Sequence, residues 1–466
     1  MTKTHLIDSH AHLEMKPFRG DLERVLERAH GAGVIHIVTV GSTVAESRRA
    51  FKLAERYSEI SAVVGIHPHD ALDADDEAML ELAKLAHRGK VVGVGETGLD
   101  FFRDRSPRNL QEDAFRRHLD LAKEVDLPVV IHVREAYPRS MEILREEGLP
   151  PKGGVVHCFS GTAGDAETYL GMGLHLSFTG TVTFPSRRSR EWAEEILTLV
   201  PLEKILVETD SPYLPPHPHR GKRNEPAHVA LVAQKIAEIK NLSPDDVARI
   251  TTRNAVRFFH LPVTLPGSRF AYTIRDSVYL NVTGKCTSAC VFCRRSANPV
   301  VKGHDLMLES DPSVEEMLAA LEDEGYAERS EVVFCGYGEP TIRLEEILEA
   351  ARRLREQGAM HIRLNTNGLG SLYHGRDITP EIAGIMDEVS VSLNAQDAGT
   401  FERLCRPSFG EVSYEAAKDF ARSCLAADMD VLITVVDHPD VDIDACRAIA
   451  EGMGARFRVR PLNEVG

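Results

Sequence analysis

Six side chains able to bind a metal ion are spread over the first 210 residues, and each follows a short apolar run. Imidazole nitrogens and carboxylate oxygens are common ligands of divalent ions in proteins. The set is His10, His12, Glu96, His132, His157 and Asp210. It suits one or two divalent ions, with Zn, Mn, Mg, Co and Ni all compatible, and Glu96 is placed to bridge two. His67, in a His-Pro-His segment, fits a substrate contact or a loop role equally well.

Three cysteines form a second chemical group, with the spacing Cys-x3-Cys-x2-Cys: Cys286, Cys290 and Cys293. Three clustered thiolates without a fourth suit a 4Fe-4S cluster that leaves one iron open. A closed zinc site needs a fourth ligand, and the nearest candidate, His304, stands eleven residues beyond Cys293. The spacing therefore favours an iron-sulfur cluster over zinc.

The first group needs a scaffold that brings distant residues together. Eight short runs rich in Val and Ile alternate with helix-period segments in the first 260 residues, which predicts an α/β fold with an N-terminal (β/α)8 TIM barrel. The expected strands are 6–8, 35–40, 61–65, 91–95, 128–131, 154–156, 175–178 and 205–208. All six ligand candidates stand at the carboxyl ends of these runs, the end where such barrels hold their active sites.

A proline- and glycine-containing stretch, residues 261–267, ends the first series. Six further strands follow, which predicts a partial (β/α)6 barrel that carries the cysteines after its first strand. These strands are expected at 277–282, 331–334, 361–364, 388–392, 431–436 and 455–459. The predicted domains are residues 1–262 and 275–466, joined by a linker over residues 263–274.

Composition supports two different chemistries and excludes some classes of function. Of 20 histidines, 16 precede residue 265, whereas seven of the eight cysteines follow it. The formal net charge of −16 gives no general attraction for nucleic acid, which argues against a duplex-coating protein and requires a local basic patch for any phosphate contact. The sequence has neither a signal peptide nor an apolar run long enough for a membrane span, so we expect no membrane partner and a cytoplasmic location.

The first part resembles the TatD family of metal-dependent deoxyribonucleases over residues 5 to about 260. The resemblance rests on the motifs Asp-Ser-His-Ala-His (8–12), Gly-Glu-Thr-Gly-Leu-Asp (95–100), His132, His-Cys-Phe-Ser-Gly (157–161) and Glu-Thr-Asp-Ser-Pro-Tyr-Leu (208–214). It implies two divalent metal ions and hydrolysis of phosphodiester bonds in DNA or other nucleic-acid ends, usually as a 3′–5′ exonuclease. It also implies that His10, His12 and Asp210 hold one ion, that His132 and His157 hold the other, and that Glu96 binds both.

A water that loses its proton near a metal needs an acceptor, and Asp210 is our candidate general base. With Glu96 it makes up the expected catalytic pair. The basic loop at residues 219–226 follows the eighth strand, where barrels often bind phosphate, and it is similar to the corresponding TatD loop. We interpret it as a phosphate clamp with Arg220, Arg223 and Asn224 as the substrate-binding residues.

The second part, about residues 275–466, resembles the radical S-adenosylmethionine superfamily through its cysteines and three later strand ends. These are Gly-Tyr-Gly-Glu (336–339), Asn-Thr-Asn-Gly (365–368) and Ser-Val-Ser-Leu-Asn (390–394). The resemblance implies a 4Fe-4S cluster, S-adenosylmethionine, and a reducing electron donor such as flavodoxin or ferredoxin. Its implied cofactor contacts are Gly336, Gly338, Glu339, Asn367, Ser392 and Asn394.

The leading hypothesis is a bifunctional protein, a TatD-like metal-dependent hydrolase fused to a radical S-adenosylmethionine enzyme of unknown substrate, similar to the TatD-associated radical proteins. One alternative keeps the metals but hydrolyses amide-type bonds or an aminoacyl ester. Related amidohydrolases commonly carry a carboxylated lysine where this chain has Glu96, which favours the phosphodiesterase. Another treats the cysteine-bearing part as a non-catalytic iron-sulfur sensing module.

Overall fold

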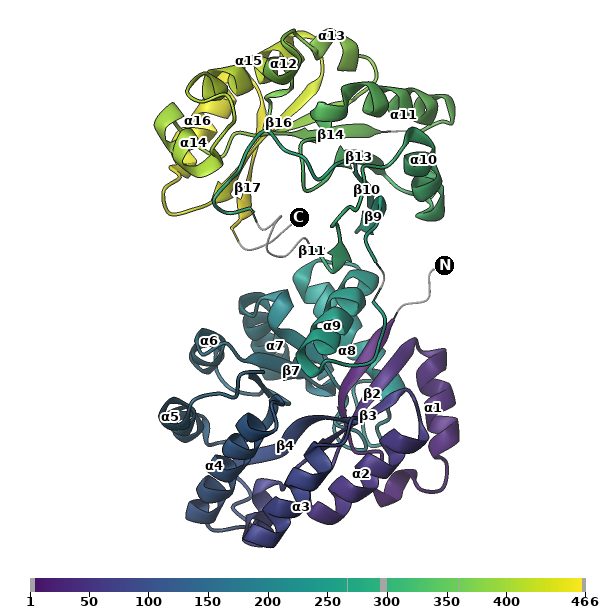
Figure 1. The fold of residues 1–466 in the computed structure, drawn as a ribbon, viewed down its shortest axis with the longest axis vertical. Coiled ribbons are helices and arrows are strands. Elements are labelled where there is room, and N and C mark those ends of the chain that lie inside the picture. Colours follow the sequence, from purple (N-terminus) through teal and green to yellow (C-terminus); the bar gives the residue numbers. More distant parts are fainter. Residues whose placement is uncertain (1–4, 266, 294–299, 360, 463–466) are drawn as a thin grey trace. The chain divides into compact units, whose positions relative to one another are not determined.

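The computed structural model describes residues 5–265, 267–293, 300–359 and 361–462, and it divides the chain into two compact units, residues 1–265 and 266–466 (Figure 1). The boundary falls in the proline-containing stretch that ends the first series of strands. No helix among the described residues is long and apolar enough to cross a membrane.

The described part of the first unit is an eight-stranded parallel barrel in the order β1 to β8, as expected. Its strands are β1 (Leu6–Ala11), β2 (Val34–Val40), β3 (Ile60–Val64), β4 (Val91–Asp100), β5 (Val129–Arg134), β6 (Gly154–Val156), β7 (His175–Phe178) and β8 (Ile205–Val207). The segment after β8 closes the barrel against β1, because the amide of Asp210 donates to the carbonyl of His10 (2.9 Å) and the amide of His12 to that of Ser211 (2.8 Å).

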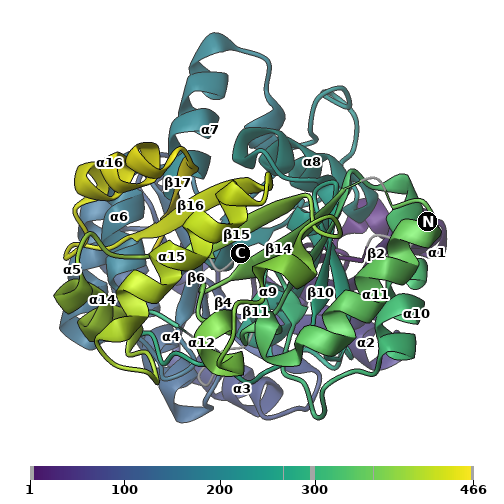
Figure 2. The same ribbon diagram turned by 90° about the horizontal axis from the view of Figure 1, so that it is seen from above.

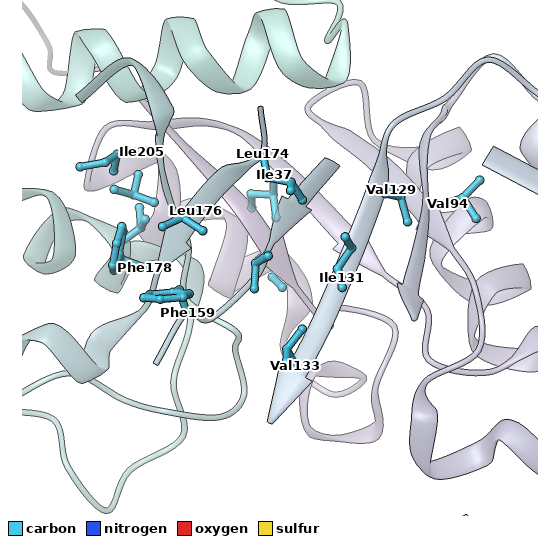
Figure 3. Close-up of a cluster of buried hydrophobic side chains, with 14 of the residues drawn as sticks. Ile37, Val94, Val129, Ile131, Val133, Phe159, Leu174, Leu176, Phe178 and Ile205 are labelled. Atoms are coloured by element: carbon cyan, nitrogen blue, oxygen red, sulfur yellow. The ribbon is translucent and has the colours of Figure 1, made fainter. Parts of the chain in front are cut away.

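Helices surround this barrel because alternate strand residues point outward and are apolar. Figure 3 shows such a cluster, with Val129, Ile131 and Val133 of β5 beside Leu176 and Phe178 of β7. The helices are α1 (Leu22–Gly31), α2 (Val44–Arg56), α3 (Asp76–Ala86), α4 (Arg108–Glu124), α5 (Tyr137–Glu147), α6 (Ala163–Gly171), α7 (Arg187–Leu199), α8 (Val229–Lys240) and α9 (Pro244–Phe259).

Inward-facing strand residues fill the barrel at one end and carry chemistry at the other. Val130 of β5 belongs to an inner apolar cluster with Phe258 and Phe259 of α9. Two positions further along the same strand, and therefore on the same face, stands His132. The packed layer thus fixes the strand that presents this imidazole.

The second unit contains a seven-stranded sheet in the order β17-β16-β15-β14-β13-β10-β9. Six of its strands are the expected parallel β/α series: β10 (Ser277–Asn281), β13 (Glu331–Cys335), β14 (Ile362–Thr366), β15 (Glu388–Ser392), β16 (Asp430–Asp437) and β17 (Arg456–Pro461). A separate two-stranded ribbon joins β11 (Val300–Val301) to β12 (His304–Asp305).

The seventh strand, β9 (Ala271–Ile274), lies inside the range expected to be a linker. It pairs antiparallel with β10, and Ser277 stands opposite Ile274. Only Arg275 and Asp276 connect the two strands, and Arg275 has φ 56°. The Arg-Asp pair lacks the glycine that marks a two-residue hairpin in a sequence, so the linker interpretation missed this strand.

Helices cover the outer face of this sheet, several of them visible along it in Figure 2. They are α10 (Val314–Asp323), α11 (Leu344–Glu356), α12 (Gly370–His374), α13 (Thr379–Ile382), α14 (Ala398–Cys405), α15 (Val412–Ala426) and α16 (Ile443–Met453). Their apolar faces share one core with β10 and β13–β16, for example Leu348 and Phe420 with Phe334. The opposite, concave face of the sheet is left for the cysteine loop and its cavity.

Candidate active sites

The structure brings the six metal-ligand candidates together at the carboxyl end of the barrel. All are largely buried: the most exposed side chains are those of His132, at 17%, and Asp210, at 14%. Asp210 adopts a left-handed conformation (φ 53°), which turns the chain sharply after β8. A carboxylate tolerates that region better than most side chains because it can hydrogen-bond locally.

Four of these residues surround one point. His10 Nε2 lies 3.4 Å from His12 Nε2 and 3.5 Å from Glu96 Oε2. Asp210 Oδ1 lies 3.3 Å from His12 Nε2 and 3.9 Å from His10 Nε2, and Glu96 Oε2 lies 3.8 Å from His12 Nε2. Ligand atoms about 2.1 Å from a tetrahedral ion are separated by about 3.4 Å, so this donor set fits one divalent ion.

The second oxygen of Glu96 faces a different group. Glu96 Oε1 lies 2.8 Å from His132 Nδ1, 2.7 Å from His157 Nε2 and 3.5 Å from His67 Nε2. The facing nitrogens of His132 and His157 are 3.1 Å apart. Because each oxygen of Glu96 faces its own group of imidazoles, the geometry suits a carboxylate shared by two ions. His67, left open between two roles, stands at this second group.

Residues behind the imidazoles fix which nitrogen faces the centre. His12 Nδ1 donates to the carbonyl of Val40 at 2.7 Å, which leaves Nε2 as the lone-pair nitrogen. Glu208 Oε1 lies 3.6 Å from His157 Nδ1, and Asp100 Oδ2 lies 3.4 Å from His132 Nε2. Such partners orient metal-ligating histidines and increase their basicity.

Sequence reasoning gave no role to Glu208 or Asp100, although both lie in the motifs behind the resemblance. Glu208 is 1% exposed; it accepts hydrogen bonds from the Cys158 amide and the Ser177 hydroxyl, both at 2.6 Å. The sequence did carry a signal for Glu208. It is a carboxylate at the end of the expected strand 205–208, which should be apolar throughout, and it stands two residues before the ligand candidate Asp210.

Glu96 stands inside β4 rather than at its end, because β4 continues to Asp100 instead of stopping at residue 95. The pairing of β4 with β5 shifts register between Val94 and Thr97. Gly95 and Gly98 have φ of 143° and 137°, and a Cβ there would lie 2.5 Å from the Val130 carbonyl oxygen and 2.1 Å from that of His132. These close approaches require glycine and allow the irregular strand that presents Glu96.

The basic loop differs from the expected phosphate clamp. Asn224 is fully buried, and its amide donates to the carbonyls of Thr209 (2.8 Å) and Tyr213 (2.7 Å). Arg223 forms a two-pronged ion pair with Asp21 (2.8 and 2.7 Å). Both side chains are thus engaged in holding the loop. Arg220 is exposed and stacks on the Phe184 ring at 3.9 Å, and of the three it is the one whose side chain forms no hydrogen bond or ion pair among the described residues.

The second unit contains a cavity of about 310 Å³ on the concave face of its sheet, within the size range of small-molecule pockets. Every residue that the sequence assigned to cluster or cofactor lines it: Cys286, Cys290, Cys293, Gly336, Gly338, Glu339, Asn367, Ser392 and Asn394. All eight cysteines of the chain are thiols rather than disulfides. Three thiols on one loop at a cavity wall fit a cluster with one open iron.

Hydrogen bonds hold the cysteine loop against neighbouring strand ends. Asn367 Nδ2 donates to Thr287 Oγ1 at 2.8 Å and lies 4.0 Å from Cys286 Sγ. The amide of Gly338 donates to the Thr283 carbonyl at 2.9 Å. A Cβ on Gly338 would lie 2.1 Å from the Lys285 carbonyl oxygen, so the loop requires glycine at this position.

Glu339, an expected cofactor contact, lines the cavity and is also tied to its neighbours by hydrogen bonds. Its carboxylate accepts hydrogen bonds from the Thr341 amide (3.1 Å) and hydroxyl (2.6 Å), from the Thr366 hydroxyl (2.7 Å) and from the Asn367 amide (2.7 Å). Burial raises the pKa of Glu339, and these donors oppose that shift. At 2% exposure, the side chain ties the end of β13 to that of β14 and so positions Asn367.

Ser392 and Asn394 lie at the far side of the cavity, after β15. Asn394 Oδ1 accepts from the Val436 amide at 3.2 Å, and Ser392 Oγ lies 3.4 Å from Thr434 Oγ1. Arg460 Nη2 also approaches both side chains, at 3.4 Å from Ser392 Oγ and 3.5 Å from Asn394 Oδ1. Ser392 and Asn394 themselves are neutral polar groups at the cavity wall.

Comparisons with known proteins divide the chain as the structure does. The family model for TatD related DNases matches residues 7–260, and that for the radical SAM superfamily matches residues 280–451. The metal-dependent hydrolase YabD of Bacillus subtilis is 43% identical over 256 residues, which cover 55% of this chain and 99% of that protein. The 3′-5′ ssDNA/RNA exonuclease TatD of Pantoea vagans is 37% identical over 262 residues, 55% of this chain and all of that protein.

A solved structure agrees with these matches. The crystal structure of YJJV, a TatD homologue from Escherichia coli, aligns with a TM-score of 0.53 at 33% identity and covers 56% of this chain and 99% of that one. One family thus matches more than half of the chain. The matched part contains the described barrel and its His and Glu metal site. The chain belongs to the TatD related DNase family, and it carries a radical SAM domain C-terminal to the hydrolase barrel.

Proposed function

We propose that the barrel is a 3′–5′ exonuclease that hydrolyses phosphodiester bonds at the ends of single-stranded DNA or RNA. The observation that carries this proposal is the position of Glu96, whose two oxygens face two separate groups of imidazoles. Two ions held by a shared carboxylate would suit an enzyme that displaces an oxygen at phosphorus. The activity for which the Pantoea vagans relative is named supports the choice of substrate.

In this proposal His10, His12 and Asp210 hold one ion, His132 and His157 hold the other, and Glu96 is shared between them. The ions, which we expect to be Zn, Mn, Mg, Co or Ni, supply positive charge to the phosphoryl group and lower the pKa of the attacking water. Burial favours the neutral form of Glu96, but the charges of His157 and His67 outweigh burial and hold the pKa of Glu96 well below its ordinary value. Bound ions would replace this imidazole charge with their own positive charge, so Glu96 would stay anionic as their ligand.

Asp210 accepts the proton of the attacking water at its carboxylate. It lies next to His12 and is among the more exposed members of the site, so water reaches it. Of the three predicted contacts in the basic loop, Arg220 is the one that we expect to bind substrate phosphate directly, because its exposed guanidinium stacks on Phe184 rather than pairing with a carboxylate. Arg223 and Asn224 act indirectly, through the shape of that loop.

We infer that the second site is a radical S-adenosylmethionine centre, in which Cys286, Cys290 and Cys293 hold the 4Fe-4S cluster. The cluster and S-adenosylmethionine supply one-electron chemistry that activates a C–H bond of a second substrate. In this chain Asn367 orients the cysteine loop, Glu339 orients Asn367, and Ser392 and Asn394 contribute neutral hydrogen-bonding groups. A low-potential donor such as flavodoxin or ferredoxin would supply the electron.

The nuclease proposal is tested with single-stranded DNA and RNA labelled at either end, in the presence of each candidate metal. We expect mononucleotides to be released from the 3′ end, release to stop with a chelator, and Asp210→Asn to reduce the rate at least about a hundredfold, as loss of a general base does. Arg188→Gln, on the exposed start of α7, is a suitable control. Hydrolysis of an aminoacyl ester or amide, without release of nucleotides, would contradict the proposal.

The radical proposal is tested by anaerobic reconstitution with iron and sulfide, followed by measurement of 5′-deoxyadenosine formed from S-adenosylmethionine under dithionite. We expect product in the wild type and none in Cys290→Ala. A cluster that forms without any cleavage would favour a sensing module instead.

A further inference from the structure

Three arginines alternate along the edge strand β17: Arg456, Arg458 and Arg460. Successive strand side chains point to opposite faces, so the three share one face while Phe457 and Val459 take the other. Arg458 and Arg460 line the cavity of the second unit. Arg456 lies further down the strand, where it donates to Glu388 at 2.7 Å.

Arg458 and Arg460 differ from Arg456 in their surroundings. Among the described residues, no carboxylate lies within 4.0 Å of either guanidinium. Their register partners on β16 are Thr434 and Val436, both uncharged. Arg460 approaches only Ser392 Oγ (3.4 Å) and Asn394 Oδ1 (3.5 Å), and its Nε is buried without a hydrogen-bond partner in the described structure.

The other charged groups of the cavity do not compensate for them. Glu339 is occupied by four hydrogen bonds, and Arg363 donates to Glu331 (2.8 and 3.0 Å). Burial and the neighbouring charge of Arg458 lower the pKa of Arg460, and the sulfurs of Cys290 and Cys405 oppose that shift without reversing it. Arg460 is partly buried, whereas Arg458 is exposed beside it at the cavity wall. A guanidinium held away from water is unfavourable unless it is paired, so the surroundings of Arg460 are suited to a ligand that brings negative charge, and Arg458 is placed to contact the same ligand.

The second unit as a whole is acidic, unlike the surroundings of Arg458 and Arg460. From residue 266 onward the chain has 21 Lys and Arg against 33 Asp and Glu, so carboxylates for pairing are abundant. In this acidic unit, two arginines at a cavity wall nevertheless face neutral Ser, Thr, Asn and Val side chains. The planar fork of a guanidinium matches the oxygens of a carboxylate or a phosphate.

We propose that Arg458 and Arg460 form an oxyanion site for the second substrate of the radical domain, which is therefore a molecule bearing a carboxylate or phosphate group. The inference rests on the proposed radical chemistry, since it places that substrate in the same cavity. The methionyl carboxylate of S-adenosylmethionine has the same chemistry and is the competing occupant. The two occupants are told apart by whether an added anion still protects Arg458 once S-adenosylmethionine is bound.

Residue-resolved modification with phenylglyoxal tests this site in the reconstituted full-length protein. The rate of modification of Arg458 is measured by peptide mass spectrometry in chloride, acetate and inorganic phosphate at matched ionic strength, with S-adenosylmethionine bound. We expect phosphate or acetate to slow modification of Arg458 at least about fivefold at saturation, by mass action, and to leave Arg456 unaffected. In Arg460→Met this protection should be lost, whereas Arg456→Gln, the matched control on the same face, should retain it.

Equal modification rates in all three anions would overturn the inference. It would also be overturned if S-adenosylmethionine alone protected Arg458 fully and added anions had no further effect, because the occupant would then be the cofactor. Measuring 5′-deoxyadenosine separates failure of the proposed radical chemistry from failure of the anion site. Protection by phosphate in a protein that forms no 5′-deoxyadenosine would support the anion site and contradict only the radical proposal.

Discussion

Replacing Glu208 with glutamine tests whether the carboxylate behind His157 supports metal binding. The substitution preserves shape but removes the charge that faces His157 Nδ1 at 3.6 Å. It also replaces one of the two carboxylate oxygens with an amide nitrogen. In the wild type one oxygen accepts from the Cys158 amide and the other from the Ser177 hydroxyl, each at 2.6 Å. The glutamine oxygen can still accept from the Cys158 amide, but the bond at Ser177 then survives only as a neutral one in which the hydroxyl accepts, so one hydrogen bond to a charged acceptor is lost.

The expected magnitudes follow from these contacts. Loss of one hydrogen bond to a buried charged group lowers the free energy of unfolding by about 1.5–3 kcal/mol. Loss of the partner behind a metal-ligating histidine weakens metal binding about 10- to 100-fold, equivalent to about 1.4–2.7 kcal/mol. The two effects are separable because only the second requires a metal.

Metal affinity is measured by competition with a chromophoric chelator, and stability by calorimetry of the metal-free protein. Glu203→Gln, an exposed carboxylate just before β8, is the matched control and should change neither quantity. If Glu208→Gln lost stability but kept wild-type metal affinity, Glu208 would be a purely structural residue and our reasoning about His157 would be wrong.

Three further predictions concern the cysteine loop and the barrel. Gly338→Ala should abolish cluster loading, measured as iron per chain, because its Cβ would lie 2.1 Å from the Lys285 carbonyl oxygen, whereas Gly284→Ala, with nothing within 4 Å, should load normally. Asn367→Ala should reduce the yield of reconstituted cluster without lowering the thermal midpoint of the barrel, measured by calorimetry of the same samples. Burial lowers the pKa of His118 to about 4, so the unfolded chain binds the proton more readily below pH 6.5. The metal-free barrel should lose about 2 kcal/mol from this group between pH 7 and 5, and the total loss should be smaller by about that amount in His118→Gln, in which His36 and His175, whose pKa values burial also lowers, still contribute.

Much of the architecture could be predicted from the sequence because its signals are periodic and local. Each expected barrel strand appears, and so do the six parallel strands of the second unit. The pattern of candidate ligands was informative for a similar reason: residues such as His132 and His157 stand directly at the ends of apolar runs, and a barrel brings all such ends together.

The remaining features depend on tertiary contacts that one sequence does not contain. The extension of β4 past Glu96 depends on how closely Gly98 approaches the carbonyl of His132. Arg223 looked like a phosphate ligand because its partner Asp21 is 202 residues away in the chain. The acceptor role of Glu339 arises from hydroxyl and amide donors on a neighbouring strand end, which spacing does not reveal.

The central claim is that one chain contains two independent catalytic sites, and measuring both activities in two single-site variants tests it most directly. We expect Glu96→Gln to abolish nucleotide release but retain 5′-deoxyadenosine formation, and Cys290→Ala to show the reverse. Loss of both activities in either variant, or wild-type protein that lacks one of them under reconstituted conditions, would contradict the claim.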